Sequence, residues 1–102
     1  MAIARVRARV GSPVGLHARP AAVFVQAVVA AGLPVFISKP DDAGAGPGGL
    51  GGVDARSILA VLALDVACGE EVELVADGAR ADEVLASLAS LLVAEDPEKS
   101  AR

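Results

Sequence analysis

The stretch Gly-Leu-His-Ala-Arg-Pro at residues 15–20 combines side chains that can carry a phosphoryl group. His17 is the only histidine in the chain. An imidazole with an ordinary pKa of about 6.5 is largely neutral at physiological pH, so one of its ring nitrogens is a nucleophile. Arg19 adds a guanidinium that can hold phosphate oxygens. A nucleophile beside an anion site is able to hold a phosphoryl group covalently.

The backbone of this stretch is predicted to form that anion site. Gly15 permits an unusual turn just before the histidine. Pro20 suits the first turn of a helix, where its missing N–H costs nothing. The first N–H groups of a helix have no intrahelical acceptor and lie at the positive end of the helix dipole. We therefore expect the amides of Ala18 and Arg19 to face an anion beside the imidazole.

Hydrophobic patterns predict the elements that position His17. Residues 3–10 alternate between arginines and small apolar side chains, which is typical of a strand with one solvated face. A helix is expected from Pro20 to about Ala31, ending at Gly32, and a last helix from near Ala81. The remaining expected elements are strands within residues 33–38, 52–55 and 70–76, and a short helix after Ser57 with that serine as its N-cap.

This order of elements predicts an α+β fold. Helices that cover one face of a small sheet give a two-layer, open-faced sandwich whose other face is in water. A chain of 102 residues is long enough for one domain. We expect that domain to occupy residues 1–94 and residues 95–102 to form a frayed tail.

Composition argues against several kinds of partner. The net charge is −4 and the chain has 2 Phe and no Trp or Tyr, which disfavours nucleic acid. One histidine and one cysteine cannot form a cluster of metal ligands, so no metal and no cofactor is expected. The lone Cys68 is expected to be a small buried apolar residue in a reducing compartment. The uncharged run at 20–37 is broken by Gly32 and Pro34, so no membrane insertion is expected. The N-terminal residues do not resemble a secretory signal, and we expect a cytoplasmic protein that is a monomer.

The glycine-rich segment at residues 44–49 formally matches the dinucleotide-binding pattern G-x-G-x-x-G. That pattern binds a pyrophosphate only where it opens a helix. No helix is expected here and Pro47 lies inside the match, so the segment is interpreted as a loop.

The string GLHARPAAVFV closely resembles the active-site signature of the HPr family, the histidine-containing phosphocarriers of the bacterial phosphotransferase system. The resemblance continues through VDARSILAVLAL, GEEVELVADG and the final helix, and covers roughly residues 3–94. It implies an antiparallel sheet of strand order 1-4-2-3 and a phosphoryl carrier rather than an enzyme. It also implies that His17 accepts phosphate on Nδ1 from phosphorylated enzyme I and passes it to a sugar-specific IIA domain. Arg19 would be the companion arginine, and the Ala18 amide would face the phosphate.

The segment SILAVLAL supplies two further candidate sites. Ser57 resembles the serine that a dedicated kinase modifies in some members of the family. The helix after it is apolar on every side, so part of its surface must stay exposed when it lies on a sheet. Ile58, Leu59 and Leu62 can share one side of that helix. The resemblance puts this side next to His17, where both partners of the relay must dock.

The resemblance also makes the first and fourth strands neighbours. Opposite charges could then pair across the open face, with Arg5, Arg7 and Arg9 on one strand and Glu71 and Glu73 on the other.

Three features depart from the family pattern. Val14 stands where many members have a polar residue. Asp65 stands where glycine is usual. The loop at residues 40–52 is several residues longer than the common form. None of these positions lies in the histidine motif.

Two alternatives compete with the carrier. The first is a regulatory protein-binding module that keeps the fold without phosphoryl relay, and the second is a small-ligand sensor of similar architecture. The intact Gly-Leu-His-Ala-Arg-Pro string argues against the first, because a module without relay has no use for the imidazole. The sequence offers no convergent polar pocket for the second.

Overall fold

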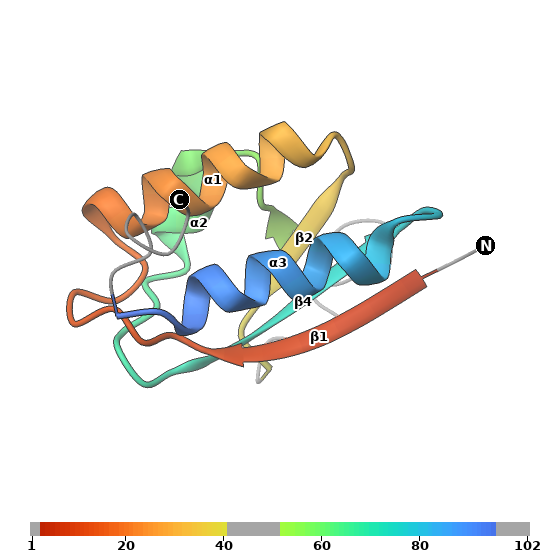
Figure 1. Ribbon diagram of the computed structural model, residues 1–102. Helices are drawn as coiled ribbons and strands as arrows, with labels where there is room; N and C mark the ends of the chain where they lie inside the picture. The colour runs from red at the N-terminus through yellow and green to blue at the C-terminus, as the bar shows by residue number, and fades with distance from the viewer. Residues whose placement is uncertain (1–2, 41–51, 96–102) are drawn as a thin grey trace.

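The computed structural model describes residues 3–40 and 52–95. Within these ranges, three helices cover one face of a four-stranded antiparallel sheet, and the opposite face is open (Figure 1). The strand order is β1-β4-β2-β3, as the resemblance implies. The elements, in chain order, are β1 (Ile3–Arg9), α1 (Ala18–Ala31), β2 (Val35–Ser38), β3 (Val53–Asp54), α2 (Ile58–Ala63), β4 (Glu71–Asp77) and α3 (Ala81–Val93).

The ends of the helices follow local chemistry. α1 begins at Ala18, two residues before the predicted start. It ends at Gly32, which has a φ of 77°, a left-handed conformation that glycine adopts without a steric penalty. Ser57 is the N-cap of α2, because its side chain accepts a hydrogen bond of 3.2 Å from the Ala60 amide. These two stop and start signals were correctly predicted.

An aliphatic core lies between the sheet and the helices. Phe24 of α1 is the largest of its fully buried side chains. The face of α3 that packs against the sheet carries buried side chains one helical turn apart. The buried core side chains of the two long helices are Ala21, Phe24, Val25, Val28, Ala81, Val84, Leu85, Leu88 and Leu92.

The open face of the sheet carries a charge ladder, formed by Arg5, Arg7, Glu71 and Glu73. Arg7 lies opposite Glu73 in the antiparallel register of β1 and β4, with 3.4 Å between Arg7 Nε and Glu73 Oε2. The other ion pairs of the ladder join Arg5 to Glu73 and Arg7 to Glu71, both at 3.5 Å. Arg9 instead donates a hydrogen bond of 2.7 Å to a carbonyl in the turn before β4. The predicted pairing is confirmed for Arg5 and Arg7.

One prediction was wrong and two others cannot be followed. Cys68 is exposed, because it lies in the turn between α2 and β4 and not in an element that packs into the core. Residues 41–51 of the long loop and 96–102 of the predicted tail lie outside the described ranges. In the part of the chain that is described, no helix has the length and hydropathy needed to cross a membrane.

Candidate functional site

His17 is the N-cap residue of α1, and its imidazole is partly exposed. The backbone at His17 is extended, with φ −134° and ψ 170°, and the side chain makes no capping hydrogen bond. The ring is therefore not used to stabilise the helix. The Ala21 amide donates to the His17 carbonyl at 3.3 Å, which closes the first turn of the helix. The imidazole is 37% exposed, enough for a partner to reach it.

The residue after the histidine has a strained backbone. Ala18 has a φ of 51°, in the left-handed region that alanine rarely occupies. Such strain persists only where the surrounding structure enforces it, and it is often found at functional sites. Here it changes the chain direction between the extended His17 and the regular helix from Arg19 onward.

The segment before the histidine is fixed to the loop that follows α2. Gly15 has a φ of 73°, and the amide of Leu16 donates to the Val66 carbonyl at 2.9 Å. A Cβ added to Gly15 would overlap the Val66 carbonyl oxygen. Gly15 is therefore required for both its dihedral angle and its close contact. These contacts bring the two loops together beside the imidazole.

Asp65, in that second loop, contacts His17 directly. Asp65 Oδ1 lies 3.1 Å from His17 Nε2, within hydrogen-bonding distance. Nothing in the sequence pairs these residues, which are 48 positions apart, and Asp65 was noted only as a departure from the family pattern. Its φ of 53° is the left-handed conformation that glycine would adopt most easily.

Lys39 and Glu70 hold the loop of Asp65 in place. Lys39 Nζ donates to the Asp65 carbonyl at 3.1 Å and lies 3.4 Å from Glu70 Oε1. The same carboxylate oxygen accepts a hydrogen bond of 2.8 Å from the Ala67 amide. The Ala67 N–H, and secondarily the Lys39 ammonium, lowers the pKa of Glu70 below its ordinary value. Sequence reasoning missed both residues: Lys39 belongs to no motif, and Glu70 lies in the segment GEEVELVADG, to which only a strand was assigned.

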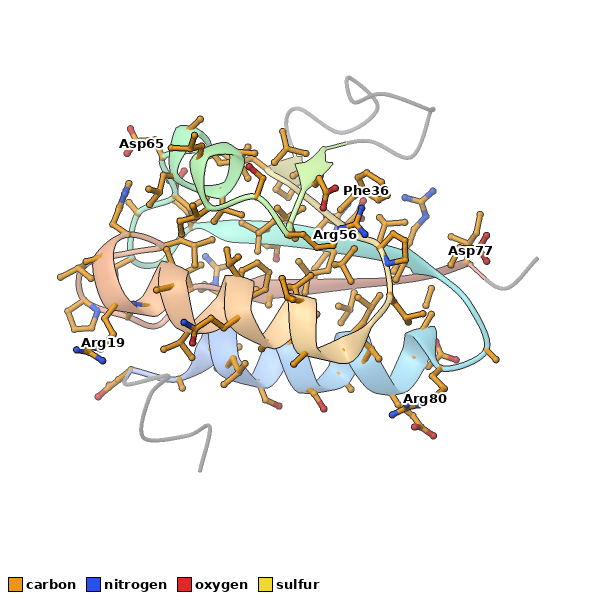
Figure 2. All side chains as sticks on the ribbon, turned by 90° about the horizontal axis from the view of Figure 1, so that it is seen from above. Arg19, Phe36, Arg56, Asp65, Asp77 and Arg80 are labelled. Carbon is orange, nitrogen blue, oxygen red and sulfur yellow. The ribbon has the colours of Figure 1, made fainter. Side chains whose placement is uncertain are left out.

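The other predicted site residues lie on α1 and α2. Arg19 is exposed near the start of α1, and Figure 2 shows it at the same end of the molecule as Asp65. Ser57 is also exposed. Of the predicted docking residues, Leu59 is 77% exposed and Ile58 is 38% exposed, whereas Leu62 is partly buried and packs against the core.

α2 and His17 are linked through Asp65. α2 ends at Ala63. Asp65 follows two residues later, and its carboxylate contacts the imidazole of His17. α2 has six residues and is about 9 Å long, and its exposed apolar side chains lie on the segment that leads into Asp65. The molecule therefore presents exposed apolar side chains and a partly exposed imidazole on neighbouring segments.

This arrangement suits a carrier of a small anionic group. His17 is partly exposed, stands at a helix N-terminus and has one ring nitrogen, Nε2, in contact with a carboxylate. Among residues 3–40 and 52–95, no group of three side chains is placed to hold a metal ion.

Comparison with known proteins identifies the family. The model of the family described as "PTS HPr component phosphorylation site" matches residues 4–94. The phosphocarrier protein HPr of Streptomyces coelicolor is 44% identical over 97 residues, which cover 95% of each chain. The HPr-like protein Crh of Bacillus subtilis is 37% identical over 81 residues, covering 79% of this chain and 85% of Crh. The crystal structure of HPr from Bacillus anthracis aligns with a TM-score of 0.74 at 31% identity, covering 88% of this chain and 96% of that one. The chain belongs to the HPr family, the phosphocarriers of the phosphotransferase system.

Proposed function

We propose that His17 is the phosphorylated residue of this phosphocarrier. In this proposal, His17 accepts a phosphoryl group from phosphorylated enzyme I in the cytoplasm and passes it to sugar-specific IIA domains. The observation that supports it most directly is the position of the chain's single histidine, partly exposed at the N-terminus of α1. Arg19 and the amides of Ala18 and Arg19 are the groups assigned to the phosphate oxygens.

The transfer needs one nucleophilic atom and no cofactor. The Nδ1 lone pair attacks phosphorus, the P–N or P–O bond to the donor breaks, and its electron pair returns to the donor. Onward transfer reverses these roles, and the electron pair of the Nδ1–P bond returns to the ring. Each ~1.4 kcal/mol of additional stabilisation of the bound phosphate would slow its release about tenfold. One arginine and a few amides suit a carrier better than a stronger anion trap.

The test is phosphate uptake from phosphoenolpyruvate and enzyme I. We expect an acid-labile, alkali-stable phosphate, as a phosphohistidine gives, and His17 is the only histidine of the chain. His17→Ala should abolish uptake with an unchanged circular dichroism spectrum, because the side chain makes no capping bond. Uptake by His17→Ala would exclude this residue as the acceptor. No uptake by the wild-type protein would favour the regulatory module without relay.

The exposed apolar side chains of α2 are proposed as the docking patch, defined here as Ile58 and Leu59 with the partly buried Leu62. Exposed apolar groups beside a reactive group mark a surface for protein contact. The partners are enzyme I and the IIA domains, which must each reach the imidazole in turn. A transient relay favours a small interface.

Ser57 is proposed as a second, regulatory site. It is exposed and directly precedes the docking patch, so a phosphate there would put negative charge where a partner binds. Ser57→Asp should leave the melting temperature nearly unchanged and slow transfer from enzyme I. Transfer kinetics equal to those of the wild-type protein would contradict this role.

A further inference from the structure

We propose that Asp65 is a positioning residue for His17, holding the Nε2 proton so that Nδ1 is the nucleophile. This inference rests on the proposed function of His17 and extends it to a residue outside the histidine motif. It is carried by the contact of 3.1 Å between Asp65 Oδ1 and His17 Nε2.

The contact determines which nitrogen can react. A neutral imidazole has one N–H donor and one bare acceptor nitrogen, whereas an ionised carboxylate can only accept. At 3.1 Å from Asp65, Nε2 must therefore be the protonated nitrogen, and Nδ1 is left with its lone pair. The carboxylate also fixes the plane of the ring, which has no capping bond to hold it.

The backbone indicates that the position of Asp65 is maintained by its surroundings. With a φ of 53°, this residue occupies a conformation that disfavours every residue type with a Cβ relative to glycine. Lys39 holds the Asp65 carbonyl, and the Leu16 amide holds the carbonyl of Val66. The carboxylate is thus presented to the imidazole from a loop that two hydrogen bonds anchor. Figure 2 shows Asp65 at the end of α2, on the end of the molecule where α1 begins.

The carboxylate assists the first half of the relay, the uptake of the phosphoryl group, without gaining a proton. When Nδ1 bonds to phosphorus, the ring becomes positively charged with its proton still on Nε2, and Asp65 stabilises that charge. When the Nδ1–P bond breaks, the electron pair returns to Nδ1 and the ring leaves as a neutral imidazole. No proton is transferred to Asp65 in either step.

The expected effect is modest because Asp65 is 88% exposed. Exposed charge pairs contribute roughly 0.2–1 kcal/mol, which limits the change in rate to about fivefold. The two informative variants are Asp65→Gly, which removes the acceptor and suits the backbone angle, and Asp65→Asn, which keeps an acceptor but removes the charge. Asp82→Asn is the matched control, because it removes one exposed negative charge at the start of α3.

The first measurement is made on the unphosphorylated protein. Nitrogen-15 NMR of the single imidazole, at a pH where it is neutral, should show the Nε2–H tautomer with a proton that exchanges slowly with water. Asp65→Gly should speed that exchange and populate the other tautomer, and Asp82→Asn should not. Spectra of Asp65→Gly identical to those of the wild-type protein would overturn the positioning role.

The second measurement is phosphoryl transfer from enzyme I. At low salt, Asp65→Gly and Asp65→Asn should lower kcat about two- to fivefold with KM nearly unchanged, while Asp82→Asn keeps the wild-type rate. The difference should shrink at high salt, where exposed charges are screened. Equal kcat values in the wild-type protein and Asp65→Gly would overturn the inference while leaving the carrier function intact. No phosphate uptake by the wild-type protein, with its Nε2–H tautomer present, would instead overturn the carrier function and with it the role of Asp65 in relay.

Discussion

The charge ladder and the histidine site are both built from polar and charged side chains at the surface, but they are organised in opposite ways. The ladder lies on regular strands, and Glu73 is shared by two arginines at 3.4 and 3.5 Å. The histidine site lies on irregular backbone, and a single contact of 3.1 Å joins His17 to Asp65. Loss of one ladder residue leaves other pairs in place, whereas the site has no second imidazole. Its precision therefore depends on the two loops that carry it.

The largest expected effect comes from disturbing the contact between those loops. Gly15→Ala would force a side chain into the left-handed region and against the Val66 carbonyl. We expect a loss of about 3 kcal/mol or more in the free energy of unfolding, because the left-handed penalty of ~1–2 kcal/mol is added to a steric overlap with backbone. Thermal or denaturant unfolding measures this loss, and phosphate uptake should fall with it.

Gly32→Ala is the matched control for that variant. Gly32 has nearly the same φ, 77°, but a Cβ there would meet nothing within 4 Å. It should therefore show the left-handed penalty alone, about 1–2 kcal/mol, with normal phosphate uptake. Equal losses for the two variants would mean that the Val66 carbonyl moves aside, and that the two loops are less tightly coupled than the structure indicates.

The same contrast explains what the sequence could predict. Period-two alternation predicted β1 and the arginines of the ladder, Gly32 predicted the end of α1, and the histidine motif predicted that His17 lies at the start of that helix. The partnership of His17 and Asp65 was not predictable, because it depends on left-handed backbone angles that no hydrophobic period encodes. Cys68 was wrongly expected in the core for a related reason, since a residue-type preference cannot say which way a turn directs a side chain.

An intermediate effect is expected at the docking patch, which contributes to binding rather than to folding. Leu59→Asp should raise KM toward enzyme I about fivefold or more, because an anchoring side chain of an interface contributes more than 1 kcal/mol. The free energy of unfolding should change by less than about 0.5 kcal/mol, since this leucine is exposed.

Val29→Asp is the control for the docking patch. Val29 is exposed to 58% on α1 and lies outside the patch, so the same change of chemistry there should leave KM unaltered. If both variants raise KM equally, the effect is one of added negative charge, and the assignment of α2 as the docking surface is wrong.

The smallest effects are expected on the charge ladder. Glu73→Gln removes the carboxylate shared by Arg5 and Arg7, whereas Glu71→Gln removes only one contact with Arg7. Both should cost less than about 1 kcal/mol in the free energy of unfolding, with the larger loss for Glu73→Gln. Repeating the unfolding in 1 M salt, where the Debye length is only about 3 Å, should reduce both losses.

Phosphate uptake by the ladder variants should not change, because the ladder lies on the open face of the sheet and His17 lies at the start of a helix on the other face. A ladder variant that slows uptake without unfolding the protein would show that the two regions are coupled, which their separate contacts argue against.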